Sequence, residues 1–154
     1  MKREFKTLND MSFSLPDGWV VSSDKYNLEN GQGFFNTENY ISPNGKVISF
    51  FEIYQQGEDF IEGYKKLTSS YTQKRDKVVL ERQFNIKLNG FSFPVFVLRG
   101  FGDKVIYNVQ VFIDCGSKLG CLMFYIDNVY EDDKKTIASS PLFMEAIKIL
   151  RTVE

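Results

Sequence analysis

Two arginines, Arg82 and Arg99, are the residues whose type and spacing most invite chemistry, because they interrupt the apolar face of a predicted hairpin. Asn89-Gly90 lies between two alternating runs, and this dipeptide is the strongest short-range signal for a two-residue hairpin turn. Counting back from the turn makes the arginines diagonal neighbours on one face. Their guanidinium groups could share one carboxylate or phosphate, as an anion or acidic-peptide site. The alternative is that both stems extend to water or to a structural acid.

Aromatic residues offer a second candidate surface, since the chain contains 15 Phe and 8 Tyr. Four of them fall in the early predicted strands, namely Phe34, Phe35, Tyr40 and Tyr54. Aromatic side chains are enriched in interface cores, so these residues could line an exposed protein-binding patch. The alternative is ordinary core packing.

The usual catalytic residues are scarce. Histidine is absent, which removes the commonest general base and the commonest metal ligand at neutral pH. Serine triads and mixed Cys/His zinc sites are excluded in their usual forms. Aspartates at predicted strand ends, Asp103, Asp114 and Asp127, could gather for acid–base work or cation binding, although such residues are usually part of turns. We expect no metal, no cofactor and no enzymatic activity.

The two cysteines occur together in the stretch CGSKLGC. If strands run on either side of this turn, Cys115 and Cys121 could face each other and form a redox bridge. The alternative is a pair of reduced, partly buried thiols.

Length and charge set the class of protein. A chain of 154 residues can remove roughly two thirds of its unfolded surface from water, so residues 1–154 are predicted to form a single domain. The net charge of -1 comes without a basic stripe, which argues against nucleic acid as a partner. No apolar window of about 18 residues occurs, so we expect no membrane span. The N-terminus has no apolar leader, and we expect a cytoplasmic location.

Alternating patterns and turn residues predict the elements that position these groups. Predicted strands cover residues 11–15, 19–22, 34–41 and 46–54, and the last is apolar on both sides, which is typical of a strand covered on both faces. Between Gly57 and Arg75 the period becomes helical, with Phe60, Tyr64, Leu67 and Tyr71 on one stripe.

Four further strands and a helix complete the chain. Two strands flank the turn at Asn89-Gly90, and two more cover residues 105–114 and 119–127, which together make an antiparallel meander. The same counting places Leu80 opposite Arg99, and it places a bulge or a gap at Pro94 because proline lacks a backbone N–H. A closing helix is predicted with a serine cap, Pro141 in its first turn, and a buried stripe of Phe143, Ala146, Ile147 and Leu150.

The stretch FSLPDGW, residues 13–19, reads as a strand, a turn and the start of a second strand that carries the only tryptophan. Together with the long hairpin and the terminal SPLFMEAIKILRTV, this stretch resembles the superfamily of PsbP, the Ran-binding Mog proteins and the DcrB-like proteins. The resemblance implies an α+β fold of the α/β/α sandwich type, with a central antiparallel sheet of about six to eight strands flanked by helices. It also implies an accessory or partner-binding role, and it carries no functional residues onto this chain.

We therefore expect a non-catalytic accessory or protein-binding module whose partner is another protein. The alternative is a small-ligand or anion-binding protein, or an enzyme using carboxylates or arginines, with a pocket between sheet and helix and Arg82 and Arg99 at its wall. The chain is expected to be a monomer, or a weak homodimer formed through an exposed strand edge.

Overall fold

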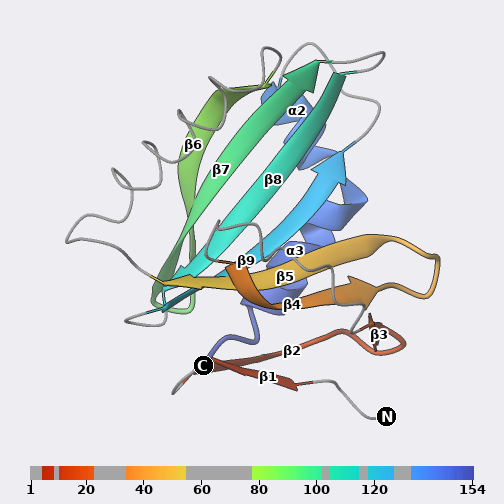
Figure 1. Ribbon diagram of the computed structural model, residues 1–154, viewed down its shortest axis with the longest axis vertical. Coiled ribbons are helices and arrows are strands. Elements are labelled where there is room, and N and C mark those ends of the chain that lie inside the picture. Colours follow the sequence, from red (N-terminus) through yellow and green to blue (C-terminus); the bar gives the residue numbers. More distant parts are fainter. Residues whose placement is uncertain are drawn as a thin grey trace.

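A seven-stranded antiparallel sheet dominates the computed structural model, which describes residues 5–8, 11–22, 34–54, 78–101, 105–114, 118–126 and 133–154. The strand order is β3-β4-β5-β9-β8-β7-β6, and a small second sheet pairs β1 with β2 (Figure 1). The strands are β1 (Phe5–Leu8), β2 (Met11–Ser14), β3 (Val20–Ser22), β4 (Phe34–Ile41), β5 (Val47–Tyr54), β6 (Val78–Leu88), β7 (Phe91–Phe101), β8 (Val105–Asp114) and β9 (Lys118–Ile126). The predicted strands are confirmed to within a residue or two, and β1 is an addition.

The hairpin of β6 and β7 keeps the predicted register for most of its length. Asn89 and Gly90 both have positive φ, as a two-residue turn requires, and Arg82 lies opposite Val97. Beyond Arg82 the prediction is wrong, because Glu81 is an extra residue in a bulge. Leu80 therefore lies opposite Leu98 instead of Arg99.

The gap predicted at Pro94 is present on the side of the hairpin that faces β8. The pairing of β7 with β8 begins at Val95 and continues to Phe101, so Pro94 lies just beyond it. On its other side, Pro94 stays in register opposite Asn85. The missing N–H of the proline thus falls where no partner strand needs it.

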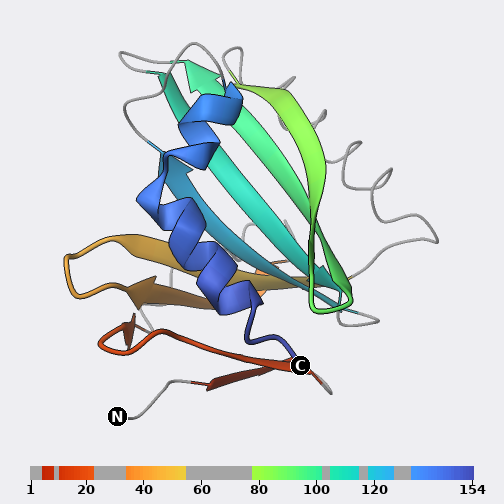
Figure 2. The ribbon, with the colours of Figure 1, turned by 180° about the vertical axis from the view of Figure 1, so that it is seen from behind.

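Two helices, α2 (Asp133–Ala138) and α3 (Pro141–Leu150), lie on one face of the main sheet (Figures 1 and 2). The closing helix is confirmed, with Ser140 as its N-cap and Pro141 at its start. Its buried stripe is turned toward Ile149, whereas Ile147 is only half-buried. The helix α2 was not predicted. Its first residues and those before it are polar, and the buried Ile137 alone does not make an apolar stripe.

Over the described residues the fold is α+β but mostly sheet, with fewer helices than an α/β/α sandwich implies. The helix predicted between Gly57 and Arg75 lies outside the described residues, so a second helical layer stays a prediction.

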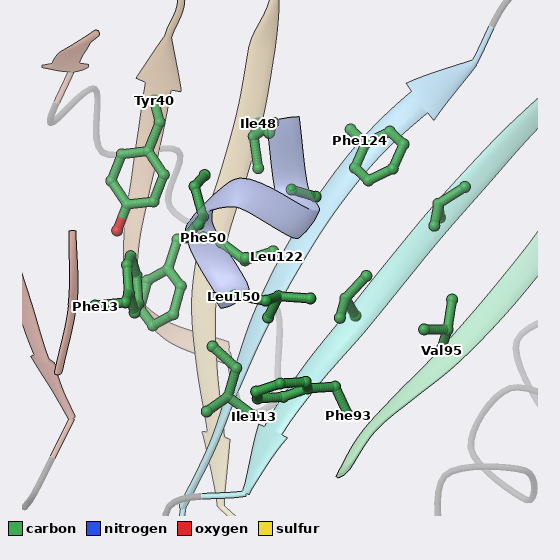
Figure 3. Close-up of a cluster of buried hydrophobic side chains, with 14 of the residues drawn as sticks. Phe13, Tyr40, Ile48, Phe50, Phe93, Val95, Ile113, Leu122, Phe124 and Leu150 are labelled. Atoms are coloured by element: carbon green, nitrogen blue, oxygen red, sulfur yellow. The ribbon is translucent and has the colours of Figure 1, made fainter. Parts of the chain in front are cut away.

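The sheet has buried side chains on both of its faces. The larger cluster lies on the helix side, where Phe13 from β2 packs among Tyr40 and Phe50 (Figure 3). Alternate residues of β8 point into this cluster: Tyr107, Val109, Val111 and Ile113. A smaller cluster on the opposite face contains Phe51, Phe96, Phe112, Leu119 and Cys121. Strand β5 contributes to both clusters, which confirms that it is buried on both faces.

The C-terminus fastens β2 to the body of the protein. Ser12 and Glu154 exchange two backbone hydrogen bonds of 3.0 and 3.1 Å, and the backbone N–H of Ser14 donates to the Thr152 hydroxyl at 2.8 Å. This attachment fixes the direction in which the chain leaves β2 and enters the turn before Trp19.

Candidate functional site

The turn between β2 and β3 delivers Trp19 to the edge of the core. The backbone N–H of Trp19 donates to the Pro16 carbonyl at 3.3 Å, and Gly18 has a φ of +83°, which glycine adopts without strain. The tryptophan side chain is 7% exposed and joins the larger core cluster. The stretch FSLPDGW is therefore a corner of the fold, as predicted.

A second turn, between β4 and β5, packs directly against this corner. Ser42 donates its backbone N–H to the Lys46 carbonyl at 2.8 Å, and its hydroxyl accepts from the Lys46 backbone N–H at 2.9 Å. The two turns touch, because a Cβ built on Gly18 would lie 3.0 Å from Cγ of Pro43.

The start of α3 supplies the third wall. The Ser140 hydroxyl accepts a hydrogen bond from the backbone N–H of Phe143 at 3.3 Å, which starts the helix beside the two turns. An open cleft of about 420 Å³ lies between the three segments and is lined by Trp19, Ser42, Pro43, Asn44, Lys46, Pro141, Leu142 and Glu145. Its walls are mainly an indole ring, two proline rings and a leucine side chain, and its volume is within the range of small binding pockets.

Two of the lining residues are charged, and they differ in their partners. Glu145 accepts from the Lys148 ammonium, with Oε1 and Nζ 3.1 Å apart. Lys46 is exposed, and within the described part of the chain it forms no ion pair. Among the described residues, Lys46 is therefore a charged lining residue without an ion pair.

Three exposed apolar side chains lie next in sequence to residues that line the cleft. They are Val20, Val47 and Met144, which are 56%, 42% and 51% exposed. Val20 lies opposite Ile41, which in turn lies opposite Val47, so these residues form one row across β3, β4 and β5, on the face of the sheet away from the helices. We call the cleft and these three exposed residues the corner surface.

The two arginines of the hairpin lie away from the corner surface and have contacts within the hairpin. Arg99 Nη1 lies 3.4 Å from Oε1 of Glu81, and both side chains are about 30% exposed. Arg82 Cζ lies 4.8 Å from the centroid of the Phe84 ring, within the range of a cation–π contact. The bulge explains the first contact, because it turns Glu81 away from the face on which regular alternation would place it.

A second, polar depression of about 660 Å³ lies at the C-terminal end, lined by Ser14, Asn89, Phe91, Arg151, Thr152, Val153 and Glu154. Neither Arg82 nor Arg99 lines either of these two cavities. The expected pocket with both arginines in its wall is thus not among them, and the anion site itself stays a prediction.

The predicted aromatic patch divides into two parts. Tyr40 is core: its side chain is almost fully buried, its ring packs on Phe13 and Phe50, and its hydroxyl donates to Glu38 at 3.0 Å. Burial and the nearby Glu38 carboxylate raise the pKa of Tyr40 well above its usual range. Phe34 and Phe35 begin β4, but their side chains, like that of Tyr54, lie outside what the structure describes.

The other candidates are dispersed. Asp114 is exposed at the end of β8, while Asp103 and Asp127 lie outside the described residues, as does Cys115. Cys121 is buried opposite Phe112, so it does not occupy the predicted position facing the other cysteine. Burial raises the pKa of the Cys121 thiol. No group of three or more Cys, Asp or Glu side chains among the described residues could hold a metal ion.

The convergence at the corner surface was missed in the sequence. Two of its three segments carry local signals in the sequence, namely FSLPDGW and the serine-proline start of α3. Nothing in those local signals says that three segments so far apart in the chain meet.

No protein-family model matches the chain, and no curated protein sequence matches it. The solution structure of cyanobacterial PsbP (CyanoP) from Synechocystis sp. PCC 6803 is similar, with a TM-score of 0.60 and 16% identity over 99% of this chain and 91% of that chain. PA94 from Pseudomonas aeruginosa, a protein of unknown function, has a TM-score of 0.44 and 14% identity over 95% of this chain and 94% of that chain. A TM-score of 0.44 is too low to support a shared fold.

The described helices include none that is long and apolar enough to cross a membrane. The similarity to CyanoP extends over nearly the whole of both chains, and it agrees with the resemblance seen in the corner, the hairpin and the closing helix. The chain therefore has the PsbP-like fold that its sequence implied.

Proposed function

We propose that the protein is a non-catalytic accessory module that binds another protein through the corner surface. The observation that carries this proposal is an open cleft with a tryptophan and two prolines in its walls, together with exposed apolar side chains that are next in sequence to its lining residues. The accessory role implied by the sequence resemblance supports the same reading.

The walls of the cleft combine two proline rings with a packed indole, and apolar side chains of the corner surface are exposed to water. Proline rings and a packed indole are already fixed before a partner arrives, so binding to them loses little side-chain entropy. Val20 and Val47 leave apolar surface in water in the same row, and burying such surface under a partner is favourable. Exposed apolar residues that lie side by side are more typical of a protein interface than exposed apolar residues scattered singly over a surface.

Site-specific crosslinking tests the proposal. A photoreactive amino acid replaces Val20 in one variant and Lys87 in a second, since Lys87 is also exposed but lies on β6, at the opposite edge of the sheet. We expect the Val20 variant to give a defined crosslinked protein in lysate of the source organism, and excess unlabelled protein should compete with it. Equal crosslinking from both positions, or none from Val20, would contradict a partner at the corner surface.

A further inference from the structure

The chemistry of the corner surface also indicates what kind of segment it binds, provided that the proposed protein-binding role holds. We infer that the partner presents an extended segment in which an apolar side chain enters the cleft and an adjacent carboxylate pairs with Lys46.

The walls select an apolar anchor. Four of the eight lining residues, Trp19, Pro43, Pro141 and Leu142, present ring or aliphatic surface, and the other four are polar or charged. A polar group buried against the apolar part of the walls would lose its water without gaining a hydrogen bond. An aliphatic, aromatic or proline side chain gains from the same burial.

The charges select an acidic flank. Glu145 already has a cationic partner in Lys148, 3.1 Å away, whereas Lys46 lines the cleft, is exposed and has no ion pair among the described residues. A carboxylate beside the anchor would complement this charge, and a basic residue would meet repulsion. Asp17 is exposed on the neighbouring turn but does not line the cleft, so it does not compensate Lys46 from within.

The surroundings favour a protein segment over a small molecule. Apolar exposure is not limited to the cleft, because Val20, Val47 and Met144 are also exposed and do not line it, and Val20 and Val47 lie on the sheet face away from the helices. A ligand seated inside the cleft would not reach them. Strand β3 is also the last strand in the order of the main sheet, so one side of its backbone faces away from β4. An extended segment can use such an edge for main-chain hydrogen bonds while its side chains reach the cleft.

A library of random peptides displayed on phage tests the inference with the full-length protein. Selected peptides should share an apolar residue next to Asp or Glu, and synthetic copies should bind in a fluorescence polarisation assay. Lys46→Glu should weaken their binding roughly tenfold. Lys87→Glu makes the same change of charge on β6 and should leave binding unchanged. A second selection against Lys46→Glu should yield basic residues in place of acidic ones.

A second variant separates this inference from the proposed function. The double variant Val20→Thr/Val47→Thr keeps β-branched side chains in both strands but makes the row more polar, and it should weaken binding by roughly fivefold. If this variant weakens binding while Lys46→Glu does not, or if the selected peptides lack acidic residues, the acidic-flank inference is wrong and the binding surface stands. If no peptide binds, or neither variant has an effect, the proposed function at the corner surface fails as well.

Discussion

The corner surface and the arginine pair of the β6–β7 hairpin represent two ways in which a folded chain can use polar and aromatic residues. At the corner, three separate segments meet and leave apolar walls and the Lys46 ammonium open to solvent. In the hairpin, residues close in sequence contact one another: Glu81 reaches Arg99, and Arg82 lies over the Phe84 ring.

The difference shows why residue type alone is a poor guide to a site. Arginines are strong anion binders, but a guanidinium that already has an acid beside it gains less from an external anion. Turn residues attract little attention, but rigid turns that converge from distant segments can leave a concave surface with no internal partner. Each prediction below tests one side of this contrast.

The largest expected effect is the loss of Trp19, which should be structural first. Trp19→Ala removes a nearly buried indole from the larger core cluster and should lower the free energy of unfolding by about 3 kcal/mol. Urea denaturation measures the effect, with Val20→Ala as the exposed neighbour that should change stability by less than about 1 kcal/mol. A Trp19→Ala protein of parental stability that had lost peptide binding would make the tryptophan a recognition residue and not a core residue.

The contact between the two turns gives the next largest effect. Gly18 and Gly90 have nearly the same positive φ, but only at Gly18 would a new Cβ meet a neighbour, Cγ of Pro43 at 3.0 Å. Gly90→Ala should cost about 1 kcal/mol from backbone strain alone, and Gly18→Ala about 2 kcal/mol because Pro43 must also move. Equal losses in thermal or urea unfolding would mean that the turns do not pack against each other.

Alkaline pH should affect the core beside the corner through Tyr40, which lies opposite Val21 of β3. Burial raises the pKa of its phenol in the folded protein above the ordinary value of 10.0, so its stabilising effect is complete below pH 10. Above that pH the unfolded chain loses the proton and the folded protein keeps it, and stability should fall by about 1.4 kcal/mol per pH unit. The buried Cys121 thiol adds a loss of the same sign from about pH 9, its ordinary value being 9.0.

Urea midpoints measured at several pH values check this expectation. Tyr40→Phe should reduce the slope above pH 10, while Arg99→Met, in the hairpin, should keep the parental slope. A Tyr40→Phe protein with the full parental slope would show that the phenol does not contribute.

The smallest expected effect is in the hairpin. The ion pair of Arg99 and Glu81 is partly exposed and 3.4 Å long, so Glu81→Gln should cost less than about 1 kcal/mol. A double-mutant cycle with Arg99→Met measures the coupling between the two residues. Titration with inorganic phosphate tests whether the hairpin binds an external anion. Phosphate binding that disappears in Arg99→Met would show that the hairpin is an anion site and not only a set of internal contacts.

Much of the fold could be predicted from local patterns. The turn at Asn89-Gly90 requires positive φ, and alternation on either side then fixes which residues of β6 and β7 share a face near the turn. The two-sided apolar pattern of β5 likewise predicted its place in the core. The serine-proline start of α3 could be read in the same way, because capping is a property of adjacent residues.

Elements that depend on tertiary contacts could not be predicted. The extra residue at Glu81 breaks the counting rule, and nothing in the surrounding alternation marks it. The helix α2 is short and polar at its start, and it is held by the burial of Thr136 and Ile137 against the rest of the molecule. Strand β1 has only four residues and depends on pairing with β2.

By itself, the sequence determined the alternation, the turns and the helix cap, because each of these depends on residues within a few positions of one another. The tertiary structure decided that Trp19, Pro43 and Pro141 face a common cleft, and that Glu81 turns toward Arg99. Those arrangements depend on how the core brings distant segments together, and the free energy of that packing is shared among many side chains. For this reason a corner that local signals identify only as a turn becomes, in the folded protein, the surface best suited to bind a partner.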